Sequence, residues 1–226
     1  ELGFCRPGFR LLELGSGTGW LGRVLAANLP LAGAIVVSER PEAMERLSAH
    51  CDEFVRARRT SMLRAESLDW RLFDPALAMD AHLPDDGYFD LVIGSDLVWN
   101  SETASSLPHI IKALIHDSRR QGGKTMVLYG HWNRSPKFVT VFLEICEAVG
   151  LAVGLYESPP TPSAGGTSAP SPLSPECEDR PAPGRAKSVQ SSSDTESDVD
   201  WTAQIFPESI SDQPIFSVYT FSLRGE

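Results

Sequence analysis

Short apolar runs alternate with longer segments of helical spacing along the first 156 residues of this chain. The short runs are rich in Leu, Ile, Val and aromatic residues, which is typical of buried strands. They lie at 10–14, 34–38, 62–68, 89–93, 125–129 and 151–156. The longer segments carry apolar residues three or four positions apart and are predicted to be helices; they lie at 18–29, 41–54, 107–115 and 138–149. Such a rhythm predicts an α/β fold with a parallel sheet between helices.

The pattern stops at residue 158 and returns near the end of the chain. Residues 158–200 are dominated by Pro, Ser, Gly and Ala, and residues 157–200 hold eight acidic residues against three basic ones. With so few apolar side chains, this stretch is predicted to be a disordered insert. Residues 214–223 are β-branched and aromatic, so they predict a seventh strand. Because no helix precedes it, we expect this strand to form an antiparallel hairpin with the sixth.

We therefore predict one domain with a seven-strand, Rossmann-like and mostly parallel sheet. Its main part is 1–157, the insert is 158–200, and 201–226 supplies the last strand of the same domain. The first strand begins within ten residues of Glu1, so we expect the sequence to be a fragment or a trimmed form of a longer protein.

A glycine-rich turn joins the first predicted strand to the first helix, where residues 12–19 read LELGSGTG. Gly15 and Gly17 allow a tight turn and a close approach of backbone to ligand, and Gly19 allows the helix to pack on the strand. Glu13 would repel a pyrophosphate at this place but suits a cation. S-adenosylmethionine carries an ammonium and a sulfonium and no phosphate, so it matches this turn. The alternative is a structural turn without a ligand.

Glu39 ends the second predicted strand. Doubly wound folds place an acid there to accept hydrogen bonds from both ribose hydroxyls of a nucleoside. Those hydroxyls are free in S-adenosylmethionine. The alternative is a surface carboxylate that only begins the next helix.

Four blocks of the sequence, LLELGSGTGWLG, VVSERPEAMERL, SLDW and FDLVIGSDLVW, occur in that order. They resemble the methyltransferase-like, seven-β-strand protein lysine methyltransferases over about residues 10–156 and the last strand. The resemblance implies that the first block binds the methionine part, the acid after strand two binds ribose, and the acid-Trp pair after strand three lies beside adenine. The predicted cofactor contacts are Glu13, Gly15, Ser16, Gly17, Gly19, Glu39, Arg40, Asp69, Trp70 and Ser95. Taken alone, Trp70 is more typical of a core side chain.

The resemblance also implies an acceptor site at Asp96 and Trp99, where the family usually has Asp, two apolar residues and Tyr. Asp96 is predicted to hold an amine, and Trp99 to wall a narrow channel through cation–π attraction. Trp99 retains the ring face but lacks the tyrosine hydroxyl. The alternatives are that Asp96 caps the next helix and that Trp99 fills the core.

Composition excludes several other classes of function. The formal net charge of −10 disfavours a nucleic-acid partner. The four cysteines and five histidines show no metal-ligand spacing, and no apolar run is long enough to span a bilayer. We expect a monomer without a membrane partner, in the cytoplasm and, as a second compartment, the nucleus.

The predicted function is an S-adenosylmethionine-dependent methyltransferase acting on a lysine side chain of a protein substrate. Methyl transfer needs alignment and a deprotonated acceptor but no covalent nucleophile, which matches the absence of a nucleophile motif. Three alternatives stay open: a methyltransferase for another protein side chain (His or Arg), one for a small molecule, and a non-catalytic binding protein with the same fold. A nicotinamide dehydrogenase is disfavoured by Glu13 and by the glycine spacing.

Overall fold

The computed structural model describes residues 6–60, 62–77, 79, 82–83, 88–132, 136–156 and 216–225. The predicted insert at 158–200 lies outside the described residues, so its disorder stays a prediction. The strands are β1 (Phe9–Leu14), β2 (Ala32–Glu39), β3 (Leu63–Ser67), β4 (Leu91–Ser95), β5 (Met126–Trp132), β6 (Leu151–Leu155) and β7 (Phe216–Leu223). The α-helices are α1 (Trp20–Asn28), α2 (Met44–Arg58), α3 (Ser101–Arg120) and α4 (Pro136–Ala148), and two 3₁₀ turns are η1 (Pro41–Ala43) and η2 (Trp70–Leu72).

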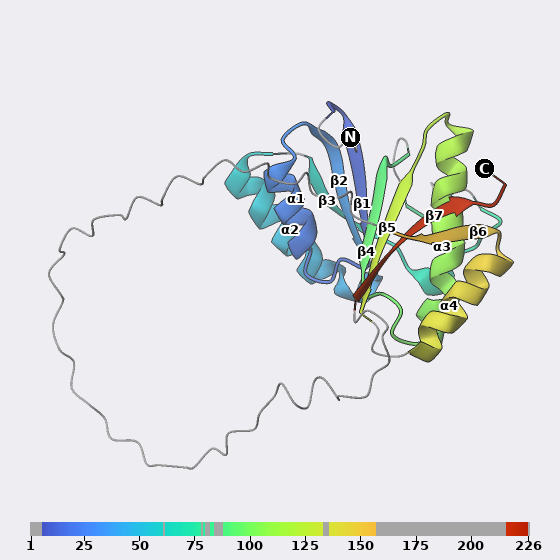
Figure 1. Cartoon of the computed structure of the whole chain (residues 1–226). Helices are drawn as coiled ribbons and strands as arrows, with labels where there is room; N and C mark the ends of the chain where they lie inside the picture. Colours follow the sequence, from blue (N-terminus) through green and yellow to red (C-terminus); the bar gives the residue numbers. More distant parts are fainter. Residues whose placement is uncertain are drawn as a thin grey trace, which may run out of the picture. The chain divides into compact units, whose positions relative to one another are not determined.

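The strands form one seven-stranded sheet in the order β3-β2-β1-β4-β5-β7-β6 (Figure 1). Neighbouring pairs among β1 to β5 are parallel. Strand β7 lies between β5 and β6 and is antiparallel to both. The predicted Rossmann-like class, with an antiparallel last strand paired to the sixth, is therefore confirmed.

Helices cover both faces of the sheet, with α1 and α2 on one side and α3 and α4 on the other (Figure 1). Alternate residues of β1 enter the two cores. Leu12 packs in the core that contains Ile111 of α3, whereas Leu11 packs in the core that contains Leu47 of α2. Burial on both faces explains why the strands read as continuous apolar runs.

The predicted boundaries differ from the observed ones most at α3, which runs from Ser101 to Arg120 instead of over the predicted 107–115, and they also differ at strand β4. This strand ends at Ser95, two residues beyond the predicted end, because Gly94 and Ser95 pair with Tyr129 and Gly130 of β5. Hydrogen bonding to a neighbouring strand, which periodicity does not report, decides this boundary. The extension carries the chain to the edge of the sheet before it turns.

The strand order reverses between β1 and β4. From β1 the chain proceeds to β2 and β3 on one side, and β4 then returns to the other side of β1. The connections that leave the carboxyl ends of β1 and β4 therefore diverge and leave a crevice. Open α/β sheets bind their ligands at such a point. None of the described helices is long and apolar enough to cross a membrane.

Candidate functional site

A cavity of about 420 Å³ opens at this crevice, which we call the central cavity. Its lining comes from the carboxyl ends of β1 to β4 and from the start of α3. The lining residues are Gly15, Gly17, Glu39, Arg40, Ala43, Arg46, Leu68, Asp69, Trp70, Arg71, Ser95, Asp96, Leu97, Trp99, Asn100, Glu102, Thr103 and Ser106. The volume is in the range of small-molecule sites.

Most of the predicted site residues meet in this cavity. Those that line it are Gly15, Gly17, Glu39, Arg40, Asp69, Trp70, Ser95, Asp96 and Trp99. Glu13, Ser16 and Gly19 are not among the lining residues. Ser16 instead holds the turn to β2, since its N–H donates to the carbonyl of Ser38 at 2.9 Å. Gly19 is buried, and a Cβ there would lie 2.7 Å from a methyl group of Leu47.

The glycine turn forms one wall of the central cavity. Gly15 has a φ of 59°, and a Cβ on it would lie 2.5 Å from a methyl group of Leu97. Gly17 has the same φ, but a Cβ there would meet no atom within 4 Å. Backbone conformation therefore favours glycine at both positions. Steric room differs, because Leu97 fills the space beside Gly15 while the space beside Gly17 is open.

Glu39 connects the end of β2 to the glycine turn. Its Oε2 accepts a hydrogen bond from the N–H of Gly17 at 2.9 Å, and its Oε1 accepts one from the N–H of Arg40 at 3.0 Å. A carboxylate has about four acceptor sites, so Glu39 can accept further bonds from a ligand. Its contact with the turn distinguishes it from a surface carboxylate that only begins a helix.

Glu13 does not face the central cavity, contrary to the expectation that it meets a cationic ligand there. Its side chain points from β1 toward α1, and its Oε2 accepts a hydrogen bond from the N–H of Gly22 at 2.8 Å. The reason is strand alternation: Glu13 is two positions from Leu11 and faces the same layer. Burial raises the pKa of Glu13 from 4.5 to about 7. Glu13 thus contacts the first turn of α1 and does not line the central cavity.

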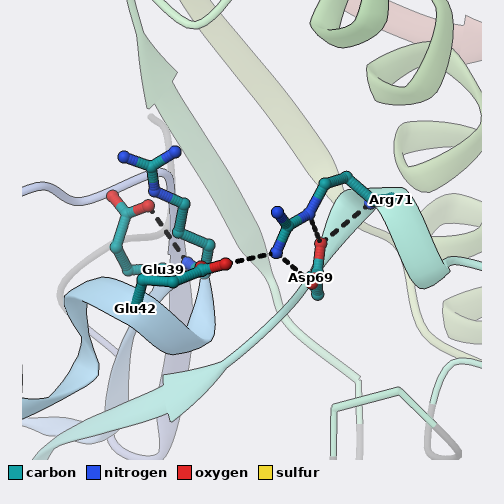
Figure 2. A network of polar contacts seen from close by, with 5 residues as sticks. Glu39, Glu42, Asp69 and Arg71 are labelled. Atoms are coloured by element: carbon teal, nitrogen blue, oxygen red, sulfur yellow. Dashed lines mark hydrogen bonds and ion pairs between the residues drawn. The ribbon is translucent and has the colours of Figure 1, made fainter.

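An ionic network ties η1 to η2 at the edge of the cavity (Figure 2). The guanidinium of Arg71 donates from Nε to Oδ1 of Asp69 at 2.8 Å and from Nη2 to Oδ2 at 2.6 Å. The same Nη2 donates to Oε1 of Glu42 at 2.7 Å. These bonds lower the pKa of Asp69 and that of Glu42. The sequence did not predict a role for Arg71, because that role depends on Glu42 after β2 and Asp69 after β3, which only the folded chain brings together.

Trp70 lies between the core and the central cavity. It packs, partly buried, against the core on the α3 side of the sheet. It also lines the central cavity, with its ring atom Cη2 3.8 Å from the place of a Cβ on Gly15. Asp69 caps η2, the 3₁₀ turn that contains Trp70, because the Asp69 side chain accepts a hydrogen bond from the N–H of Arg71 at 3.0 Å. Trp70 therefore forms a flat apolar wall opposite the glycine turn.

The connection from β4 to α3 brings Asp96 and Trp99 to the cavity. Asp96 has a φ of 54°, which Asp tolerates better than most residues. Trp99 is 62% exposed, so it does not fill the core. It stands at an open mouth, and the described residues do not enclose it in a narrow channel. The cap of α3 is Asn100 and not Asp96, because the Asn100 side chain accepts from the N–H of Thr103 at 2.8 Å.

Metal ligation finds no support in the part of the chain that the structure describes. No group of three or more His, Cys, Asp or Glu side chains there is placed to hold a metal ion. The described cysteines, Cys51 and Cys146, are buried free thiols.

The strand order, with β7 antiparallel between β5 and β6, makes this a Rossmann-like, seven-strand fold with a glycine turn after β1 and an acid at the end of β2. A profile of the family described as lysine methyltransferase matches residues 6–147, and the chain belongs to that family. No curated protein sequence matches the chain significantly.

Solved methyltransferase structures resemble the chain at low identity. A Thermoplasma acidophilum protein assigned as a methyltransferase is 16% identical, with a TM-score of 0.44 over 74% of this chain and 63% of its own. Precorrin-6y C5,15-methyltransferase from Geobacter metallireducens is 16% identical, with a TM-score of 0.43 over 69% of this chain and 71% of its own. TrmN from Thermus thermophilus is 16% identical, with a TM-score of 0.43 over 67% of this chain and 39% of its own. The chain thus spans less than two thirds of the first and third proteins, and such identities say nothing about substrate.

Proposed function

We propose that this chain transfers a methyl group from S-adenosylmethionine to a lysine side chain of a protein. The observation that carries the proposal is that one cavity is lined both by the glycine turn with Glu39 and by Asp96 with Trp99. Membership of the lysine methyltransferase family supports the choice of acceptor. The wide mouth at Trp99 suits a side chain presented by a large molecule better than an enclosed small one.

The residues of the cavity fit S-adenosylmethionine. Gly17 leaves open space for a ligand beside the turn, Glu39 retains acceptor sites for ribose hydroxyls, and Trp70 offers an apolar wall for adenine. Asp69 would contribute mainly by holding this wall, because it accepts three hydrogen bonds from Arg71, two at Oδ1 and one at Oδ2, which leaves fewer acceptor sites than Glu39 retains. When bound, S-adenosylmethionine supplies a methyl group on a positively charged sulfur.

The acceptor end of the cavity has the groups that a lysine needs. Asp96 can accept hydrogen bonds from the ammonium and direct it into the cavity, and the ring of Trp99 can attract it through its face. The ammonium must lose a proton before it attacks, and its removal from water on entering the cavity favours the neutral amine. Alignment and partial exclusion of water then provide most of the rate enhancement.

Asp96→Asn tests this assignment, because it removes the charge while retaining a residue that tolerates a positive φ. We expect methyl transfer from labelled S-adenosylmethionine to protein in a cell extract to fall by about 10²-fold or more. Affinity for S-adenosylmethionine, measured by calorimetry, should stay within a few-fold of the wild type. Asp52→Asn, an exposed substitution on α2 outside the cavity, is the matched control and should change neither quantity.

Mass spectrometry of the labelled protein then identifies the modified residue. Label on lysine supports the proposal, whereas label on histidine or arginine would replace lysine with the neighbouring alternative. Wild-type turnover by Asp96→Asn would remove Asp96 from the acceptor site. Absence of cofactor binding and of transfer by the wild type would favour a non-catalytic protein with this fold.

A further inference from the structure

Strand β5 anchors the loop that carries the proposed acceptor residues. We define this acceptor loop as residues 95–100, between β4 and α3. The N–H of Asp96 donates to the carbonyl of Gly130 at 2.8 Å. The N–H of Val98 donates to the hydroxyl of Tyr129 at 3.0 Å. The bond from Asp96 joins two backbone groups and hardly depends on the side chains present. The bond from Val98 needs the side chain of Tyr129.

The hydroxyl of Tyr129 has a second partner, which fixes its orientation. It lies 2.9 Å from Nδ1 of His131. When His131 carries its proton on Nε2, its Nδ1 accepts the hydroxyl proton of Tyr129 while that hydroxyl accepts from the N–H of Val98. Tyr129 and His131 are 2% and 3% exposed. Burial also raises the pKa of Tyr129 well above its usual range, so the hydroxyl keeps its proton.

Leu97 locks the same loop from the other side. Its side chain is buried against the glycine turn, where a Cβ on Gly15 would lie 2.5 Å from its Cδ2. A Cβ on Gly94 would lie 2.6 Å from its Cδ1. Leu97 and Val98 are therefore buried in the middle of the loop, between Asp96 and Trp99, and Leu97 lines the cavity together with these two residues.

We propose that Tyr129 and His131 are positioning residues for methyl transfer: their hydrogen-bonded pair holds Val98 and so sets the directions of Asp96 and Trp99. The proposal rests on the proposed function of the acceptor loop. Neither residue lines the central cavity. Their effect is therefore indirect, through the geometry at the acceptor end, while the cofactor end is held separately by the contact between Glu39 and Gly17. A small displacement of a reacting group can lower a rate by about 10²-fold.

Tyr129→Phe removes the hydroxyl and keeps the ring. We expect kcat on the labelled protein substrate to fall at least about tenfold, with affinity for S-adenosylmethionine within about threefold. Amide hydrogen exchange at Val98, followed by NMR, should quicken by about tenfold or more, because a bond of about 1.4 kcal/mol is lost. Tyr219→Phe is the matched control: its ring stacks on Tyr129 with centroids 6.3 Å apart, and no described hydrogen bond joins it to the loop. It should leave all three quantities unchanged.

Substitutions of His131 provide a second test that leaves the bond between Val98 and Tyr129 in place. His131→Asn keeps an acceptor at the δ position and should retain most of the wild-type kcat. His131→Leu removes the acceptor and should lower kcat in the direction of Tyr129→Phe, again without a matching loss of cofactor affinity. If His131 only filled space, His131→Asn would not be expected to retain a higher kcat than His131→Leu.

The outcomes separate this proposal from the proposed function. If the wild type transfers methyl groups and Tyr129→Phe does so equally well, or if Val98 exchanges no faster, the positioning role is wrong and the function stands. If cofactor affinity and kcat fall together in Tyr129→Phe, the residue supports the whole site and the assignment is also wrong. If the wild type transfers nothing, the proposed function fails, and the exchange of Val98 alone decides whether the pair holds the loop.

Discussion

Glu13→Gln should remove a pH dependence of stability that the buried carboxyl of Glu13 creates. In the folded chain burial raises its pKa from an ordinary value of 4.5 to about 7. The unfolded chain therefore loses this proton at lower pH than the folded chain, and stability falls as the pH rises from 4.5 to 7. Below 4.5 both states are protonated and the carboxyl causes no penalty, whereas above 7 the penalty is complete. At about 1.4 kcal/mol for each pKa unit, it amounts to about 3 kcal/mol.

Gln in this position keeps an oxygen that can accept the N–H of Gly22, but it carries no charge at any pH. Urea unfolding of both proteins at pH 4, 5, 6, 7 and 8 should give nearly equal stabilities at the lowest pH. At pH 8 the variant should be more stable, by up to about 3 kcal/mol. Glu53→Gln, at an exposed site on α2, should show no such divergence. A constant difference between wild type and Glu13→Gln across this range, or a wild type that gains on the variant as the pH rises, would refute the reasoning.

Other substitutions test the cavity itself. Gly17→Arg should abolish binding of S-adenosylmethionine in calorimetry, because its side chain enters open cavity space at a φ of 59°; retained binding would place the ligand elsewhere. Glu39→Ala should weaken that affinity about tenfold to a hundredfold, through loss of a charge-assisted acceptor. Arg71→Met should change the free energy of unfolding by less than about 1 kcal/mol, because Arg71 is 46% exposed and its partner Glu42 is 56% exposed; a larger loss in urea unfolding would show that the network supports the fold. Trp99→Phe should retain more methyl transfer than Trp99→Ala in the labelling assay, and equal losses would exclude a role for the ring face.

The fold was predictable because burial leaves a direct trace in the sequence. Strands covered on both faces, such as β1 and β2, appear as short apolar runs, and helices such as α3 show apolar residues at helical spacing. The aromatic and β-branched run of β7 also indicated a strand beyond the insert. Glycines at which the chain turns, such as Gly150 before β6, also indicated from the sequence alone where helices end.

The site was predictable where a residue's position at a strand end determines its place. Glu39 and Asp96 follow parallel strands, so both reach the same edge of the sheet. Prediction failed for Glu13, because a single step along β1 decides which layer a side chain faces. The network of Arg71 and the contact of Leu97 with Gly15 depend on tertiary approach, and they leave no local pattern.

The place of β7 between β5 and β6 has a consequence for biosynthesis. A ribosome completes β5 long before it makes β7, so a nascent chain carries β5 with an unpaired edge. Unpaired edges invite association with other chains, and this one ends beside the acceptor loop. A chaperone that shields β5 during synthesis, or early loss of the last strand by proteolysis, would therefore act on folding yield and on the shape of the site at once.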